Sequence, residues 1–349
     1  MEDYNSVAYH AGEPDKSTFI EANYSRLYAM AMWYEDNIAK YHMPHDMIVN
    51  TYFDTAAAVG NPVSYSMTGD SAEWTGHYLV GEACRYATHV REGNLTLAQE
   101  SLGNITRTLQ GYDKILHVAP NGGMARYAWP LDEYPGYIRD NIYLGEWKGD
   151  YYMYEDDTSR DMHNGVIMGL GIVYHLVDHE ETRSTIRRLV DDMLTILMEK
   201  GWLYIDPEGD PNGTDLDVGY FVFGTGGFWT LAYLKVGAIV YPEKYESLYV
   251  EYAIERDYIH RSNNAEFSRT NLVQSYYGLL LDWEIMFILC TLEDNSILKS
   301  IYLEHVDKMY QLTKNDRTAI FNIIWLVLHN EKNNTIQSGT VQETVLNDV

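Results

Sequence analysis

The feature that most constrains the fold is a helical periodicity of apolar residues that returns along most of the chain. Apolar side chains recur at spacings of three and four residues, the pattern of an amphipathic α-helix. The periodic segments are 17–41, 71–91, 95–117, 161–177, 182–200, 226–239, 243–260, 266–290, 294–312 and 316–330. Short turns such as Glu92-Gly93-Asn94 and Tyr241-Pro242 join many of them in pairs. The sequence therefore predicts an all-α fold built from antiparallel helical hairpins.

The two helices of a pair differ in polarity. Segment 320–328 is apolar nearly all round, whereas 180–200 carries its charges in a stripe. A helix that is apolar on every side belongs in an interior, and a striped helix faces solvent. No constant repeat length is visible, which disfavours a solenoid. We therefore predict an (α/α)6 toroid, a closed ring of hairpins with inner and outer layers. It is expected to form a single domain over 1–333, followed by a flexible tail over 334–349.

The charge of the chain excludes several classes of partner. The 349 residues include 25 Lys and Arg against 51 Asp and Glu, a formal net charge of −26. This charge repels phosphate backbones and anionic lipid surfaces. No apolar run approaches the roughly 18 residues of a membrane span. We expect a soluble protein with no nucleic-acid or membrane partner, either cytoplasmic or secreted with a leader that this sequence does not contain. Its oligomeric state stays open.

Carboxylates collect where the predicted inner helices begin. Segments 70–73, 158–161 and 263–266 each have a side-chain acceptor followed three positions later by an acid, the pattern of a capping box. Capping alone is a sufficient explanation for such residues. In a toroid, however, the inner helices run parallel and their N-termini meet at one mouth. The same acids would then line one funnel, so they are candidates for a functional site as well.

The densest polar group covers residues 156–164. Asp157 and Asp161 are four positions apart and share a helix face if the helix begins early. Like charges placed in this way raise the pKa of one acid, which favours a general acid. Arg160 would instead join them in an ion-pair network, and calcium is a further alternative, although no EF-hand spacing is present. Arg160 and His163 are candidate substrate contacts.

A second polar group opens the 71–91 helix. Asp70 and Glu73 are followed by Trp74, His77 and Tyr78. Spacings of three and four residues place Trp74, His77 and Tyr78 on one side of the helix, where they would form a funnel wall. For His77 the alternative is a hydrogen-bonded core histidine.

Further candidate contacts come from two other parts of the chain. Arg269 and Asn271 are polar residues on a helix predicted to be buried, so they must be paired or face a cavity. The connection 118–160 is too long for a plain linker. Within it, a glycine turn leads to a short extended segment that carries Arg126 and Trp129. This segment would place both side chains over the funnel; the alternative is a loop that packs on the barrel end through its own aromatic residues.

Signatures of several other chemistries are absent from the sequence. There is no GxSxG elbow, HExxH helix, CxxC pair or kinase motif set. The sequence therefore predicts no cofactor and no metal, with a structural calcium as the one alternative.

Three runs of residues carry a resemblance to a known group of proteins. They are Glu73-Trp74-Thr75-Gly76-His77-Tyr78, Trp147-Lys148-Gly149-Asp150, and Asp157-Thr158-Ser159-Arg160-Asp161 before a glycine-rich helix. Together they resemble an (α/α)6-barrel family related to the six-hairpin glycosidases. The resemblance covers roughly residues 70–285 and implies the toroid fold and carbohydrate chemistry. In that family the Trp-x-Gly-Asp run joins Asp-Thr-Ser directly, whereas here 151–156 are inserted, so no role is carried over to Asp150.

The resulting hypothesis is a glycoside hydrolase that uses two carboxylates at the mouth of the ring. Asp161 or Asp157 would be the acid, and Asp70 or Glu73 the opposing base. Aromatic rings would stack on sugar faces and an Arg would hold a carboxylate or hydroxyl group. These contacts are assigned to Trp74, Trp129, Trp147, Arg126 and Arg269.

Two alternatives stay open from the sequence. One is a polysaccharide lyase acting on uronates, in which His77 or a Tyr abstracts the proton and an Arg neutralises the sugar acid. The other is a noncatalytic toroid that binds a glycan or a protein, in which the acids serve only as caps. Fold-level analogy does not separate these possibilities, because toroids of this kind host several functions.

Overall fold

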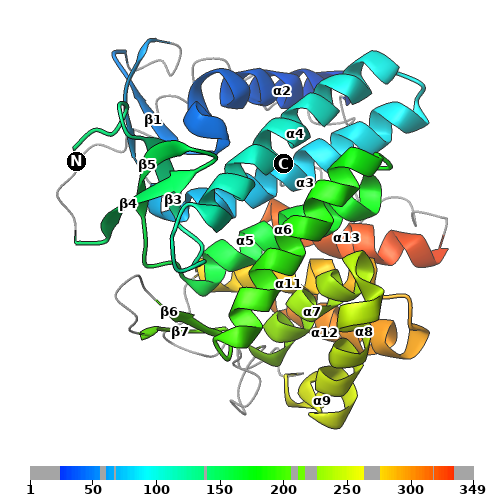
Figure 1. Ribbon diagram of the computed structural model, residues 1–349. Coiled ribbons are helices and arrows are strands. Elements are labelled where there is room, and N and C mark those ends of the chain that lie inside the picture. The colour runs from blue at the N-terminus through cyan, green and yellow to red at the C-terminus, as the bar shows by residue number, and fades with distance from the viewer. Residues whose placement is uncertain are drawn as a thin grey trace.

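A computed structural model describes residues 24–55, 60–66, 68–136, 140–205, 211–216, 226–262, 276–316 and 318–333. This part of the chain is mainly helical, which confirms the predicted all-α class (Figure 1). Its α-helices are α2 (Tyr24–Asn37), α3 (Ser71–Arg91), α4 (Leu95–His117), α5 (Arg160–Leu176), α6 (Glu180–Glu199), α7 (Gly226–Val240), α8 (Pro242–Val250), α9 (Tyr258–Arg261), α11 (Tyr276–Leu292), α12 (Ser296–Thr313) and α13 (Ala319–Asn333).

Shorter elements fill the connections between these helices. Single helical turns are η2 (Ile38–His42), η3 (Pro44–Asp46), η4 (Thr68–Asp70) and η5 (Glu251–Glu255). The strands are β1 (Asn50–Phe53), β2 (Pro62–Ser66), β3 (Tyr127–Pro130), β4 (Ile142–Trp147), β5 (Asp150–Glu155), β6 (Leu203–Ile205) and β7 (Pro211–Asp215). Most helix boundaries agree with the periodic segments to within a few residues. The predicted 243–260 helix is interrupted, because Asp257 has a left-handed backbone with φ 58°.

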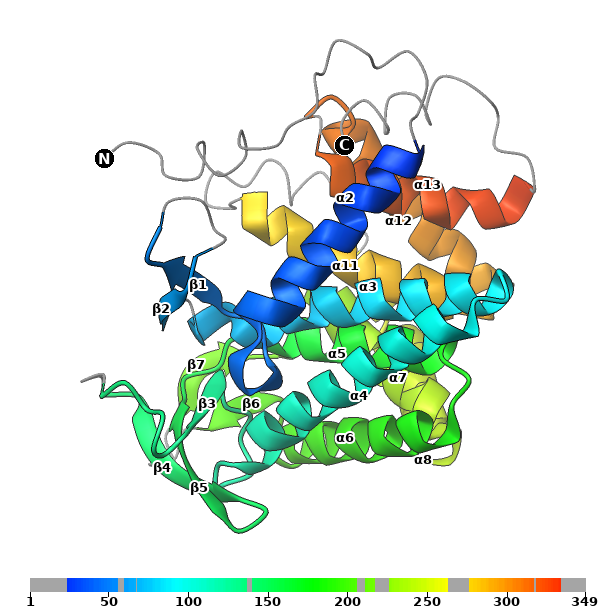
Figure 2. The same cartoon turned by 90° about the horizontal axis from the view of Figure 1, so that it is seen from above.

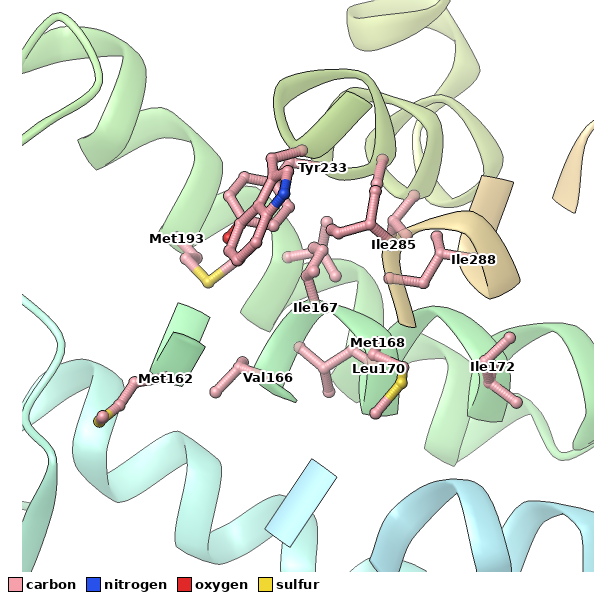
Figure 3. Packing of buried hydrophobic residues seen from close by; sticks show 14 of the residues in the cluster. Met162, Val166, Ile167, Met168, Leu170, Ile172, Met193, Tyr233, Ile285 and Ile288 are labelled. Atoms are coloured by element: carbon pink, nitrogen blue, oxygen red, sulfur yellow. The ribbon is translucent and has the colours of Figure 1, made fainter. Parts of the chain in front are cut away.

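Helix α5 occupies the centre of the helical packing. Every residue from Met162 to Val173 is buried, and α5 contacts α3, α6, α7 and α11. Figure 3 shows side chains from α5, α7 and α11 gathered in this core, among them Ile167, Tyr233 and Ile285. Buried apolar residues form one cluster that extends from Met47 to Leu328.

Successive helices pack against each other as hairpin partners. Helices α4, α6, α8 and α12 pack against α3, α5, α7 and α11, respectively (Figure 2). The predicted difference in polarity holds for α6, whose buried side carries Ile186, Leu189 and Val190. It is wrong for α13, where Ile320 and Val327 are 40% and 49% exposed. Four hairpins are thus described, and the closed six-hairpin ring and the single domain over 1–333 stay predictions.

The strands lie together at the end of the molecule where α3 and α5 begin (Figures 1 and 2). The long connection before α5 forms an antiparallel sheet in the order β3-β5-β4. Lys148 and Gly149 link β4 to β5, both with positive φ, as a tight two-residue hairpin requires. The predicted extended segment with Trp129 is strand β3. This connection is therefore an ordered sheet that packs over the helix ends.

In the part that the structure describes, no helix combines the length and the apolar character needed to cross a membrane. The predicted tail over 334–349 lies outside the described residues.

Candidate functional site

The N-terminal ends of α3, α5 and α11 meet beneath the strands. The ring centroids of Trp74 on α3 and Tyr277 on α11 are 6.0 Å apart. The Tyr277 hydroxyl donates a hydrogen bond to Asp161 Oδ2 on α5, at 3.1 Å. One to two turns further along, His77 of α3 contacts Glu284 of α11. The three helices therefore run parallel here, as the sequence predicted for inner helices.

Asp70 and Asp161 stand at the entrances of α3 and α5. Both are half-buried. Burial raises the pKa of Asp70, the nearby negative charge of Asp161 raises it further, and the positive charge of Arg126 partly offsets the increase. Asp161 accepts hydrogen bonds from Tyr277 and from the Ser159 hydroxyl. The structure thus brings together two of the predicted carboxylates from different helices.

Capping does not account for these acids. Asp70 occupies the N-cap position of α3, yet its side chain makes no capping hydrogen bond. At α5 the predicted acceptor Thr158 donates to the Met124 backbone oxygen instead. Ser159, which occupies the N-cap position, makes no capping hydrogen bond because its hydroxyl is directed to Asp161. Both oxygens of Glu73, the predicted box partner, are buried and have no hydrogen-bond partner in the described part of the chain. The capping-box interpretation is therefore wrong at these two helices.

Below this pair lies a second group of polar side chains. Glu73, His77 and Glu284 bring one ligand atom each to within 4.8 Å of one another. His77 Nε2 is 2.8 Å from Glu284 Oε1 and 3.4 Å from Glu73 Oε1. Glu73 is 0% and Glu284 is 1% exposed, whereas the His77 side chain is 28% exposed. Solvent therefore reaches this group from the His77 side.

Burial and the proximity of the two carboxylates together set the protonation of this group. Burial raises the pKa of Glu73 well above its usual value, and the charge of Glu284 adds to the increase. Burial lowers the pKa of His77, but contacts with Glu284 and Glu73 outweigh this effect and raise it to about 10. A protonated His77 compensates only one of the two acids, so a second positive charge or a proton is needed.

Sequence reasoning did not find Glu284 or Asn164 as site residues. Asn164 Nδ2 donates to Glu284 Oε2 at 2.6 Å, across 120 positions in the chain. The available signal was the pair Asp282 and Glu284 within the otherwise apolar helix α11. A buried acid needs a partner, so each was a candidate. Asp282 accepts a hydrogen bond from Trp229 Nε1 at 3.3 Å.

The guanidinium of Arg126 positions the backbone through two hydrogen bonds. Its Nε donates to the backbone oxygen of Asp157 at 2.6 Å, and Nη1 donates to that of Gly69 at 3.3 Å. It thus ties the segment before α3 to the segment before α5.

The predicted pairing of Asp157 with Asp161 on one helix face is wrong. Helix α5 begins at Arg160, and Asp157 precedes it with φ 68° in an exposed position. Arg160 is also exposed at the helix start.

Two other predicted contacts, Trp129 and Trp147, lie in the β3-β5-β4 sheet. Trp129 is 3% exposed and packs between Tyr127 and Tyr134, so it presents no face to a sugar. Trp147 sits at the β4–β5 hairpin against Tyr152.

Tyr78 and His163 likewise face other parts of the molecule. The Tyr78 hydroxyl donates to Glu35 of α2 at 2.8 Å. His163 Nδ1 lies 2.9 Å from the Ser159 backbone oxygen, and its ring faces Tyr204. The predicted contacts Arg269 and Asn271 lie outside the described residues.

A separate cavity of about 370 Å³ opens between α4, α6 and the loop before β3. Of the predicted residues, only His163 lines it. Asp191, Asp192, Lys200 and Lys244 contribute its charged groups. None of the carboxylates at the helix ends lines this cavity, so we place the candidate site at the helix ends, where Asp70 and Asp161 lie close together.

Comparisons with known proteins assign no family or function to this chain. No protein-family model, curated protein or solved structure matches this chain. The resemblance to the six-hairpin glycosidases stays a prediction.

Proposed function

We propose that this protein is a glycoside hydrolase built on an (α/α)6 toroid, with its active site at the N-terminal ends of α3, α5 and α11. The observation that carries the proposal is the pairing of Asp70 and Asp161. They come from two parallel helices, neither caps its helix, and the charge of one raises the pKa of the other. Two carboxylates with unequal protonation are the basic requirement of glycoside hydrolysis.

The environments of the two acids suggest their roles. Asp70, whose pKa is raised, is the general acid that protonates the leaving oxygen. Asp161 accepts hydrogen bonds from the hydroxyl groups of Ser159 and Tyr277, which hold its carboxyl group in place, and we assign it the role of base or nucleophile. This reverses the order in which the sequence analysis assigned the two roles.

Aromatic side chains beside the acids supply a surface for a sugar ring. Trp74 and Tyr277 are half-buried and lie within 6.0 Å of each other. Rings of this kind offer an apolar face for stacking together with a polar edge. The Arg126 guanidinium donates to the backbone oxygens of Asp157 and Gly69, so we assign it no contact with the sugar.

The test is hydrolysis of a panel of neutral and acidic glycans by the full chain. Release of reducing ends is measured for the native protein, Asp70→Asn, Asp161→Asn and the control Asp178→Asn, whose side chain is 91% exposed. We expect turnover by the native and control proteins and its loss in both site variants, with all four folded by circular dichroism.

Other outcomes would replace the proposal with one of its alternatives. An unsaturated product that absorbs in the ultraviolet would indicate a lyase. Glycan binding without turnover across the panel would indicate a noncatalytic binding protein.

A further inference from the structure

The group formed by Glu73, His77 and Glu284 has the composition and spacing of a metal-binding site. Glu73 and His77 are one turn apart on α3, and Glu284 comes from α11. Ligands that share one ion at 2.0–2.2 Å lie about 3.0–3.6 Å from each other. The measured separations from His77 Nε2, 2.8 Å to Glu284 and 3.4 Å to Glu73, are close to this range.

Unsatisfied oxygens provide an independent indication of a missing ligand. Both carboxylate oxygens of Glu73 and Oε1 of Glu284 are buried and have no hydrogen-bond partner among the described residues. His77 Nε2 approaches both acids but makes no well-aligned hydrogen bond to either. Buried carboxylates are normally hydrogen-bonded, paired or bound to a metal. One ligand atom from each of the three residues lies within 4.8 Å of the others, so one cation would contact all three side chains.

The neighbouring helix α5 packs closely against this group and orients one ligand. A β-carbon on Gly165 of α5 would lie 2.5 Å from Glu73 Oε2, so glycine is required for α5 to approach this carboxylate. Asn164 donates to Glu284 Oε2 at 2.6 Å and leaves Oε1 directed at His77. A hydrogen bond to the outer oxygen of a ligating carboxylate is a typical second contact around a metal.

We propose that Glu73, His77 and Glu284 bind one divalent transition-metal ion, such as Zn²⁺ or Mn²⁺. Two carboxylates and one imidazole form a mixed oxygen and nitrogen ligand set, which suits these ions better than Ca²⁺ or Mg²⁺, since those prefer oxygen ligands alone. His77 is the most exposed of the three ligands, so solvent reaches the group on its side. The proposed metal site is independent of glycan hydrolysis, because it requires neither Asp70 nor Asp161.

The rival explanation is a triad held together by protons alone. In it, Glu73 carries a proton and a charged His77 pairs with Glu284, so the group is neutral without an ion. Both explanations compensate the negative charge of the buried carboxylates. They differ in whether the folded protein binds a metal ion.

Metal binding by the full chain separates the two explanations. The protein is treated with a chelator, dialysed and titrated with Zn²⁺, Mn²⁺ or Ca²⁺, and bound metal is measured by calorimetry and elemental analysis. We expect one equivalent of Zn²⁺ or Mn²⁺ and a higher melting temperature with the ion than without it. Glu73→Gln and Glu284→Gln should each weaken binding at least roughly tenfold.

The controls test whether binding occurs at this group. Glu82→Gln changes another buried acid on the same helix and should bind metal like the native chain. Asp70→Asn and Asp161→Asn should also bind normally, even if they abolish hydrolysis. If the Glu variants fail to fold, His77→Gln serves instead, because this side chain is partly exposed. Loss of the His77 imidazole should alter the visible spectrum of the Co²⁺-substituted protein.

Two results would overturn the proposal. One is a folded native chain that binds neither Zn²⁺ nor Mn²⁺ at a stoichiometric level. The other is binding that survives unchanged in Glu73→Gln, Glu284→Gln and His77→Gln. Either result would leave the proton-linked triad as the explanation.

Discussion

Gly76 of α3 and Gly165 of α5 meet so closely that a β-carbon on Gly76 would lie 2.1 Å from the Gly165 carbonyl oxygen. A β-carbon on Gly165 would lie 2.4 Å from the Glu73 α-carbon. The two helix backbones are therefore in direct contact. This contact sets the distance between the acids of α3 and the polar residues of α5, and it links the packing of the core to the geometry of the site.

Replacing Gly76 with Ala should destabilise the protein. The added methyl group has no room and must separate two buried helices, which typically costs about 1–3 kcal/mol. Gly81→Ala on the same helix is the matched control, because a β-carbon there meets nothing within 4 Å. It should be neutral or stabilising by up to about 1 kcal/mol. Urea unfolding measures both changes, and equal stabilities of the two variants would contradict the close contact.

Stability should fall as pH rises from about 4.5 to 8, in part because of Glu82. Burial, and then the neighbouring Glu35, raise the pKa of Glu82 from 4.5 to about 8 despite its contact with Arg85. The folded state therefore binds more protons than the unfolded state in this window, and ionisation of Glu82 disfavours folding.

Glu82→Gln should remove this part of the pH dependence. We expect little change at pH 4 and a gain of at least about 1 kcal/mol at pH 8, measured by thermal unfolding. Glu100→Gln is the control, since its side chain is 57% exposed and lies near the same Arg85. Parallel stability curves for native and Glu82→Gln proteins would refute the prediction.

The buried ion pair between Lys235 and Glu293 should be sensitive to loss of one partner. Lys235 Nζ lies 3.0 Å from Glu293 Oε1, and their side chains are 9% and 2% exposed. Lys235→Met leaves an uncompensated buried carboxylate, which costs about 3–5 kcal/mol. Adding Glu293→Gln should recover much of this loss. Chemical denaturation of the single and double variants provides the test, and a cost below about 1 kcal/mol for Lys235→Met would count against it.

If Asp70 is the general acid, the rate of hydrolysis should decrease as pH rises through its raised pKa. The positive charge of Arg126 lowers the pKa of Asp70. Removing this charge in Arg126→Gln should therefore raise that pKa and move the alkaline limb of the pH–rate profile to higher pH. Arg126→Lys keeps the charge and should shift the limb less. An unshifted limb in both variants would argue against Asp70 as the acid.

Tyr277 and Trp74 should affect different kinetic constants. Tyr277→Phe removes the hydrogen bond to Asp161 but keeps the ring beside Trp74. A hydrogen bond to a charged group contributes about 1.5–3 kcal/mol, so we expect a decrease in kcat of at least roughly tenfold. Trp74→Ala removes a stacking surface and should mainly raise KM. Identical effects of the two substitutions on kcat and KM would not fit the proposed division of roles.

Local features of the chain were readable from the sequence. Helices α3 and α4 span the residues that the periodicity indicated, because the spacing of apolar residues within a helix is a local property. The parallel N-termini followed from the alternation of inner and outer helices. The grouping of Asp70, Glu73, Trp74 and His77 required only that they share one helix.

Other features depended on contacts between distant residues. The sequence alone determined which segments become helices and where acids collect at their beginnings. Only the tertiary structure decided that Glu284 joins Glu73 and His77, and that Trp129 is buried in the sheet rather than offered to a ligand. The physical reason is that burial and the pairing of charges are set by neighbours in space. No spacing along the chain records that α11 brings Glu284 next to α3.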